Sequence, residues 1–179
     1  MSLINTSRRK FLRFSFALFL LPLTRLMGDT TPDEKETLTL HVSRDSVNHK
    51  ITFMEDGEIV EDRYIELCHI FKDERADVAV KMDPELFKIL ARGQQWLLKY
   101  GYNQALVITS AFRTLMTNLN TEGAAQNSMH IYGKAVDIKY PGLPIYYLAS
   151  LFRTFGAAGI GIYPTFLHID TWKERVWRG

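Results

Sequence analysis

Two short apolar segments of this chain carry ionisable residues, and this combination restricts the folds that the chain can adopt. The acid in Val136-Asp137-Ile138 lies between two apolar β-branched residues, and Leu167-His168-Ile169-Asp170 places a histidine and an acid on one face of a strand. A carboxylate buried in an apolar strand is costly unless a cation or hydrogen bonds satisfy it. We therefore expect both segments to be strands whose polar groups share a partner.

A third ionisable residue, His130, precedes these segments in Ser128-Met129-His130-Ile131-Tyr132-Gly133-Lys134-Ala135, where Gly133 lets the backbone turn. Taken alone, each histidine is more often a hydrogen-bonded core or surface residue than a ligand. Together, His130, Asp137 and His168 form a three-ligand set that leaves zinc (Zn2+) an open fourth position for water. The other three histidines lack a ligand companion at a telling spacing, so we expect them to be structural or solvated: His41, His49 and His69.

The segments around these residues predict a single α+β domain. Residues 37–43 alternate as a strand, and Asp56-Gly57 between two further β segments signals a hairpin. Asp83 and Pro84 mark the start of a helix that Gly101 ends. Other patterns predict helices at 61–72 and 144–155, and strands at 105–109, 136–139 and 166–169. Their sum is an antiparallel sheet with helices packed on it and the zinc site on the sheet.

The first 28 residues have the pattern of an export signal. The basic stretch Ser7-Arg8-Arg9-Lys10-Phe11-Leu12-Arg13 precedes an apolar run at 14–23, which is shorter than the about 20 residues of a membrane span. The adjacent arginines resemble the twin-arginine signal, which implies the twin-arginine export machinery as a partner and the periplasm as the destination. No clear Ala-x-Ala cleavage site follows, so an interfacial or retained anchor that tethers the chain to a membrane stays open. Residues 29–36 are polar, and we expect a linker there.

The charge distribution excludes a nucleic-acid binder. Five of the 22 basic residues precede the first acid, Asp29, so 17 basic residues remain against 20 acidic ones. A nucleic-acid-binding domain would keep a basic surface after this subtraction. The single cysteine, Cys68, allows no intramolecular disulfide, and its amphipathic surroundings predict a small buried hydrophobe.

The segment from Ser128 to Asp137 matches the pattern Ser-x-His-x-x-Gly-x-Ala-x-Asp. It resembles the metallopeptidase superfamily that contains the D-alanyl-D-alanine dipeptidases and carboxypeptidases and the hedgehog signalling domain. The resemblance implies that His130, Asp137 and a later histidine, His168, bind zinc, and that residues 37–179 form a zinc metallopeptidase domain. Residues 108–114 resemble the superfamily's Ser-x-x-Arg-Ser segment, whose arginine, here Arg113, faces the substrate.

Further segments resemble one branch of this superfamily, the twin-arginine-exported murein endopeptidases. They are Gly159-Ile160-Gly161-Ile162-Tyr163-Pro164 leading into His168, Phe71-Lys72-Asp73-Glu74-Arg75, and Met82-Asp83-Pro84. The implied substrates are the crosslinked stem peptides of peptidoglycan (murein). The bond that is cut stays open between D-alanyl to diaminopimelate, diaminopimelate to diaminopimelate, and a terminal D-alanine.

The implied mechanism is metal-assisted amide hydrolysis, in which zinc lowers the pKa of a bound water to roughly 7 and polarises the scissile carbonyl. Arg113 would stabilise the developing oxyanion or anchor a substrate carboxylate. A structural ion pair is the alternative for this arginine.

The general base is the point at which this chain departs from many of the superfamily's members. These carry an acid three residues before the final histidine or a histidine two before it, where this chain has Thr165 and Phe166. Asp170 is the nearest candidate. As base it would need to come within about 3 Å of the zinc-bound water, directly or through one further water. As an outer residue it would orient a ligand instead. Both roles stay open.

Two other functions compete with a murein peptidase. The missing acid at position 165 is compatible with a catalytically silent module that holds the metal and binds the cell wall. A structural protein without metal is the third hypothesis, and it predicts no stoichiometric zinc in the folded chain.

Overall fold

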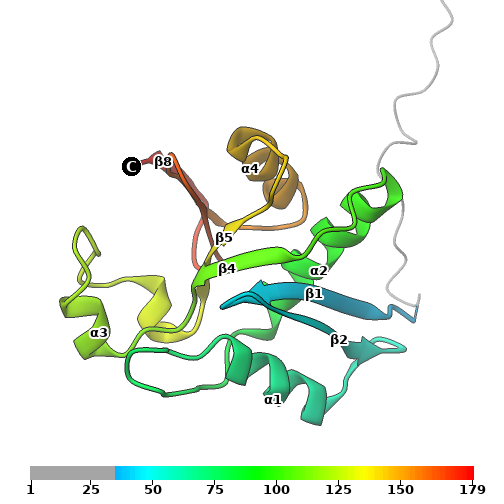
Figure 1. The fold of residues 1–179 in the computed structure, drawn as a ribbon, viewed down its shortest axis with the longest axis horizontal. Helices are drawn as coiled ribbons and strands as arrows, with labels where there is room; N and C mark the ends of the chain where they lie inside the picture. The colour runs from blue at the N-terminus through cyan, green and yellow to red at the C-terminus, as the bar shows by residue number, and fades with distance from the viewer. Residues whose placement is uncertain (1–34) are drawn as a thin grey trace, which may run out of the picture. The chain divides into compact units, whose positions relative to one another are not determined.

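The computed structural model describes residues 35–179, so the predicted export signal and most of the predicted linker lie outside the described residues. Eight strands form one sheet in the order β3-β2-β1-β4-β5-β7-β6-β8 (Figure 1). The strands are β1 (Leu38–Arg44), β2 (Val47–Glu55), β3 (Glu58–Ile59), β4 (Leu106–Ser110), β5 (Ala135–Lys139), β6 (Gly159–Ile162), β7 (Leu167–Asp170) and β8 (Arg175–Arg178). Neighbours are antiparallel except in the pairs β1–β4 and β6–β8. The predicted α+β class is confirmed.

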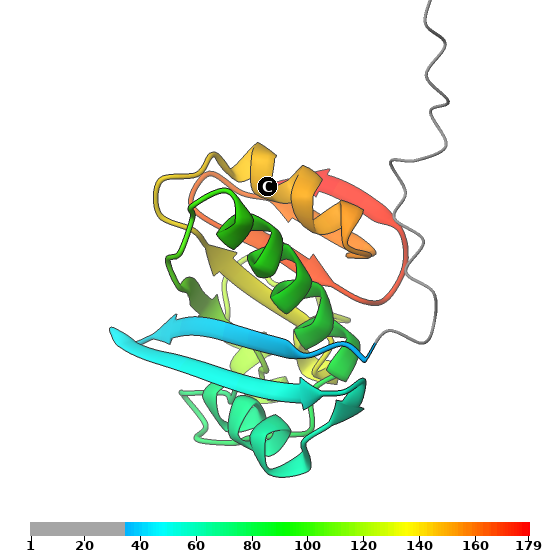
Figure 2. The ribbon, with the colours of Figure 1, turned by 90° about the vertical axis from the view of Figure 1, so that its right-hand side faces the viewer.

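The helices are α1 (Glu61–Ile70), α2 (Pro84–Lys99), α3 (Leu115–Leu119) and α4 (Ile145–Thr154), with a 3-10 turn, η2 (Met129–Tyr132). Helices α2 and α4 lie side by side across one face of the sheet, and α1 packs on β2 (Figure 2). Within residues 35–179, no helix combines the length and the apolar character that crossing a membrane requires.

Helix α2 follows from its sequence as expected. The Asp83 side chain accepts a hydrogen bond from the Glu85 amide at 3.0 Å, and Pro84 occupies the first turn, where a missing amide costs nothing. The apolar side of the helix is buried against the sheet, with Phe87 and Leu90 fully inaccessible. After Lys99 the chain leaves the helix, and Gly101 takes the left-handed φ of +85°.

Strand alternation separates the core from the opposite face of the sheet. In β5, Val136 and Ile138 join the hydrophobic core, so Asp137 between them points to the other side. In β7, Leu167 and Ile169 join the core and His168 points away from it. The segment between β4 and β5, which contains α3 and η2, lies over this second face. The fold therefore directs the ionisable residues of both strands into one space.

Several elements were not predicted. The hydrophobic periodicity of the sequence did not predict strands β6 and β8, because β6 is Gly-Ile-Gly-Ile and both strands are only four residues long. Helix α1 ends at Ile70 rather than at residue 72. Cys68 is buried, as expected, and its sulfur accepts a hydrogen bond from the Met82 amide.

The contact between α2 and α4 gives a stability prediction. A Cβ added at Gly93 would lie 2.5 Å from a ring carbon of Phe152, which is fully buried. Gly93→Ala gains about 1 kcal/mol of helix propensity, whereas overpacking a core costs about 1–3 kcal/mol. We therefore expect a lower melting temperature by calorimetry. Ser150→Ala, on the exposed side of α4, is the control, and a Gly93→Ala variant as stable as wild type would contradict this packing.

Candidate metal centre

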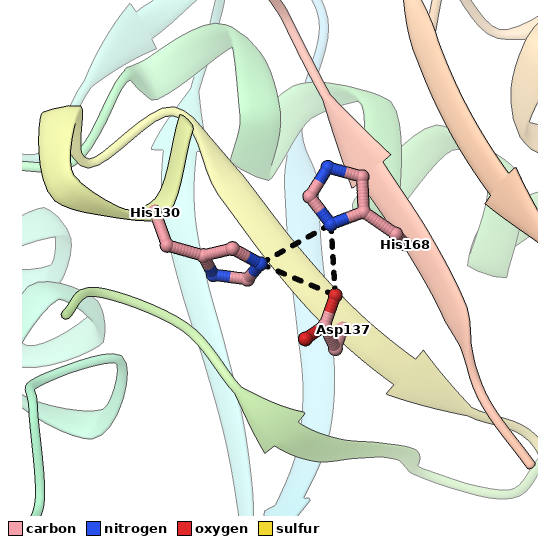
Figure 3. Close-up of side chains that lie close together, drawn as sticks. All are labelled: His130, Asp137 and His168. Atoms are coloured by element: carbon pink, nitrogen blue, oxygen red, sulfur yellow. Dashed lines mark hydrogen bonds and ion pairs between the residues drawn. The ribbon is translucent and has the colours of Figure 1, made fainter. Parts of the chain in front are cut away.

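Three side chains from three elements meet on the face of the sheet opposite α2 and α4, and Figure 3 shows them pointing toward one another. The Nε2 atom of His130, from η2, lies 3.1 Å from Nδ1 of His168, on β7, and 3.2 Å from Oδ1 of Asp137, on β5. Nδ1 of His168 lies 2.9 Å from the same oxygen. All three residues are buried. The structure thus brings together the three residues that the sequence singled out.

In each of His130 and His168, the ring nitrogen that faces away from the other candidate ligands, here called the outer nitrogen, lies close to a hydrogen-bond acceptor. Nδ1 of His130 lies 2.6 Å from the carbonyl oxygen of Ala111, and Nε2 of His168 lies 3.0 Å from Oδ2 of Asp170. A carbonyl and a carboxylate only accept, so each outer nitrogen carries the proton of a neutral ring. The inner nitrogens of His130 and His168 then present lone pairs, and they face the carboxylate of Asp137. Three lone pairs thus point into one space.

A cation fits this set of donors. Around a tetrahedral zinc ion with bonds of about 2.0–2.1 Å, neighbouring ligand atoms are about 3.3 Å apart, close to the separations found here. Two imidazoles and one carboxylate form a ligand set that suits zinc. The residues present therefore fit a zinc ion, and their role as its ligands stays a prediction.

Burial and the carboxylates of Asp137 and Asp170 determine the protonation of the three candidate ligands. Burial lowers the pKa of His130. Burial also acts to lower the pKa of His168, but its hydrogen bonds to Asp137 and Asp170 outweigh this and raise the pKa. Burial acts to raise the pKa of Asp137, and the two histidines outweigh it and hold the pKa well below its usual range. Asp137 is therefore ionised and acts only as an acceptor.

Asp170 is enclosed by hydrogen-bond donors and has no exposed surface. Besides His168, it accepts from the Trp172 amide at 3.0 Å and from Arg175, whose Nη1 and Nη2 lie 3.1 and 2.6 Å from its two oxygens. Burial acts to raise the pKa of Asp170, but these contacts outweigh it and lower the pKa. Its carboxylate lies on the far side of the imidazole from Asp137. This geometry favours the role of a residue that orients His168 over that of a general base.

Two glycines of β6 make room for this arrangement. A Cβ at Gly159 would lie inside van der Waals distance of the Asp170 carboxylate, and one at Gly161 would lie 2.6 Å from a ring carbon of Trp177. Sequence reasoning did not identify Gly159 or Arg175 as site residues. The available signal was a buried acid at position 170 that needed a cation, together with a strand of alternating glycines.

Arg113 lies beside the three candidate ligands. Its Nη2 donates to Oδ2 of Asp137 at 2.9 Å, and its Nε donates to the hydroxyl of Ser110 at 2.8 Å. The ion pair that the sequence left as an alternative is therefore present. The ion pair with Asp137 occupies only part of the Arg113 guanidinium. Arg113 also lines the cleft over the candidate ligands, so the ion pair leaves donors of the guanidinium for a substrate.

A buried acid fixes the turn that carries Arg113. Asp73 is 2% exposed, and its Oδ2 accepts from the amide and the hydroxyl of Thr114 at 2.7 and 3.0 Å. Its Oδ1 accepts from the amides of Arg75 and Ala76. The loop after α1 is thereby tied to the residue that follows Arg113.

A second acid ties three elements together. The Asp83 amide donates to the carbonyl oxygen of Gly133 at 2.8 Å, and the Thr171 hydroxyl donates to Oδ2 of Asp83 at 2.7 Å. Gly133 ends η2 with a left-handed φ of +65°. Asp83 thus holds the start of α2, the turn after His130 and the end of β7 in one place.

A cleft of about 690 Å³ opens over the three candidate ligands, within the usual range for ligand sites of about 300–1,000 Å³. One wall is the loop at residues 121–129. Aromatic residues form another wall, where Tyr163 and Phe166 stack with ring centroids 4.4 Å apart and the Trp177 indole donates to the Tyr163 hydroxyl. The cleft gives a ligand direct access to the three candidate metal ligands.

The packing of Gly159 gives a test of the outer contacts. In Gly159→Ala the added methyl group displaces the Asp170 carboxylate and frees the ring of His168. Changes to such outer partners cost about 10- to 100-fold in metal affinity, and we expect a loss of that size in a zinc titration. Gly57→Ala is the control, because it strains a hairpin with φ of +83° without meeting any atom within 4 Å. Unchanged zinc affinity in Gly159→Ala would contradict the role of Asp170.

The Asp73 contacts give a pH-dependent prediction. Burial acts to raise the pKa of Asp73, but its hydrogen bonds from Thr117, Thr114 and Ala76 outweigh this and lower the pKa. A carboxyl with a lowered folded pKa stabilises the protein above the unfolded pKa of about 3.9, and this stabilisation is lost as the pH falls. Asp73→Asn should therefore cost about 1–3 kcal/mol at pH 7, with a smaller difference from wild type at pH 3.

Thermal unfolding at several pH values, with a chelator present so that metal loss does not contribute, measures this difference. Asp62→Asn, at an exposed acid of α1, is the control. A destabilisation of Asp73→Asn that is the same at pH 3 and pH 7 would rule out the carboxylate as its cause.

Comparison with known proteins agrees with these features. A family model described as peptidoglycan L,D-endopeptidase MepK matches residues 30–177. The chain is 34% identical over 120 residues to the probable peptidoglycan L,D-endopeptidase MepK of Haemophilus influenzae, and the match covers 63% of each protein. It is 28% identical over 186 residues to the peptidoglycan L,D-endopeptidase MepK of Escherichia coli K12, covering 99% of this chain and 100% of that protein. The Shigella flexneri protein of the same name has the same identity and coverage. The chain therefore belongs to the peptidoglycan L,D-endopeptidase MepK family of M15 peptidases.

Proposed function

We propose that this protein is a zinc-dependent L,D-endopeptidase that hydrolyses amide bonds in the crosslinked stem peptides of peptidoglycan. The observation that carries the proposal is the convergence of three possible ligand atoms, from His130, Asp137 and His168, in an open cleft. The names of the relatives support peptidoglycan as the substrate. An exported protein with a twin-arginine signal at residues 1–28, a linker at 29–36 and a peptidase domain at 37–179 would meet this substrate in the periplasm.

The L,D designation in the names of the relatives limits which peptide bond can be the substrate bond. Of the three bonds that the sequence left open, the diaminopimelate–diaminopimelate crosslink joins the carbonyl of an L-centre to the amine of a D-centre. The D-alanyl crosslink instead joins two D-centres, and release of a terminal D-alanine is not an endopeptidase reaction. We therefore assign the diaminopimelate–diaminopimelate crosslink as the substrate bond.

In this proposal, His130, Asp137 and His168 would hold the zinc ion through the atoms that face one another, Nε2 of His130, Oδ1 of Asp137 and Nδ1 of His168. When bound, zinc supplies Lewis-acid chemistry, because it lowers the pKa of water to about 7 and polarises a carbonyl group. Ala111 and Asp170 hold the two imidazoles in the tautomers that leave the inner nitrogens free. Arg175 keeps Asp170 ionised and fixed in place, so Asp170 acts through His168.

Arg113 is the cation placed to stabilise negative charge on the substrate. One arm of its guanidinium donates to the outer oxygen of Asp137, which also fixes the rotamer of that ligand. Its remaining donors lie at the cleft, where they can reach the oxygen of the scissile carbonyl as negative charge develops on it. Since a fixed donor needs no reorganisation during the reaction, Arg113 favours the transition state over the bound substrate.

The alternative of a catalytically silent wall-binding module keeps the same metal ligands. The family match and the endopeptidase relatives do not favour it. The two functions differ in their products. Only a peptidase cuts the crosslinks and so releases monomeric muropeptides from crosslinked ones.

Replacing His168 separates the hypotheses. In His168→Ala, we expect loss of stoichiometric zinc and a fall of at least 100-fold in cleavage of isolated peptidoglycan, measured by mass spectrometry of the muropeptides. His69→Ala, at an exposed histidine of α1, is the matched control and should keep both properties. A chelator should abolish wild-type cleavage, and added zinc should restore it.

Cleavage that survives in His168→Ala would falsify the metal mechanism. Wild-type protein that binds zinc and peptidoglycan but releases no product would support the silent module instead.

A further inference from the structure

Three cations line the cleft, and their partners differ. Arg113 pairs with Asp137, and Arg175 pairs with Asp170. The third, Lys139, forms no ion pair or side-chain hydrogen bond with any residue at positions 35–179, and it is exposed. A lysine elsewhere on the surface would be solvated and need no further role. At this position, however, its positive charge is available to a ligand that enters the cleft.

The strand geometry places Lys139 close to the metal centre. It is the last residue of β5, and Ile138 before it is in the core, so Lys139 points to the same face as Asp137. Two residues of a strand span about 7 Å, which is within the reach of one lysine side chain. The pairing of Ile138 with Leu167 brings Lys139 towards the Phe166 side of the cleft. Lys139 therefore lies two residues along β5 from the candidate ligand Asp137, on the same face of the sheet.

The proposed substrate carries an anion at a matching position. In a diaminopimelate–diaminopimelate crosslink, the D-centre that supplies the amide nitrogen keeps its own free carboxylate, one carbon away from that nitrogen. In an ordinary peptide, this carbon would be the carbonyl of the next amide and carry no charge. An ammonium near the scissile bond can therefore distinguish the crosslink from an ordinary peptide bond.

We propose that Lys139 binds the carboxylate of the D-centre next to the scissile amide and so favours the crosslink over an ordinary peptide bond. The inference rests on the proposed function and deepens it. Lysine suits the task because its ammonium is a compact charge on a flexible stem, and a charge-assisted hydrogen bond to a carboxylate is about twice as strong as a neutral one. The carboxylate thereby fixes which end of the crosslink points along β5.

The test compares two substrates in the zinc-loaded full chain. One is the crosslinked peptide with its D-centre carboxylate free, and the other is the same peptide with that carboxylate amidated. In Lys139→Gln we expect kcat/KM to fall about tenfold or more for the free carboxylate, the equivalent of one charged contact, and to stay within about threefold for the amide. Lys139→Arg should keep most of the activity. Lys99→Gln, at an exposed lysine of α2 on the other side of the sheet, is the control.

A binding measurement makes the result independent of turnover. Calorimetry with the uncrosslinked stem peptide, the half of the product that carries this carboxylate, should show weaker binding to Lys139→Gln, again by about tenfold, and no such loss for the amidated peptide. Equal losses for the free and amidated peptides, or no loss for either, would overturn the role of Lys139. If the wild type cuts neither crosslinked peptide, the proposed function fails, and the binding comparison still decides whether Lys139 recognises the carboxylate.

Discussion

The convergence of three lone pairs at one point is the constraint on which the rest of the site depends. The inner nitrogens of the two imidazoles and the ionised carboxylate of Asp137 face one another at 2.9–3.2 Å, and without a metal ion a proton taken up by His168 is what joins that ring to Asp137. Buried groups of this kind are destabilising unless a proton or a metal ion joins them. The contacts of Ala111 and Asp170 to the outer nitrogens direct the free lone pairs inward. The local structure is thus organised for a cation.

The fold supplies this arrangement by dividing the sheet into two faces. The alternation of β5 and β7 sends apolar residues to the helices and polar residues to the cleft, so the core and the centre share the same strands. Two buried or partly buried acids outside the centre then hold the irregular segments in place. Asp73 fixes the turn of Arg113, and Asp83 joins the start of α2 to the end of η2. The rigidity of the centre therefore depends on residues far from it in the sequence.

Much of this could be predicted from the sequence, because the informative residues lie in short regular segments. His168 and Asp137 stand out in apolar strands, and Asp83-Pro84 defines the start of α2. The environment of Asp170 could not be predicted, since it depends on the pairing of β6 with β7 and β8, which brings Gly159 and Arg175 to the carboxylate. The same limit applies to Lys139, because only the folded cleft distinguishes it from the lysines of the solvated surface.

Diffraction from crystals grown with zinc, recorded on both sides of the zinc absorption edge, tests the central claim most directly. We expect one strong anomalous peak bounded by Nε2 of His130, Oδ1 of Asp137 and Nδ1 of His168, with Asp170 outside the coordination sphere and bonded to the far nitrogen of His168. A well-ordered map without a peak between these three atoms, or a zinc ion bound through the outer nitrogens, would contradict it.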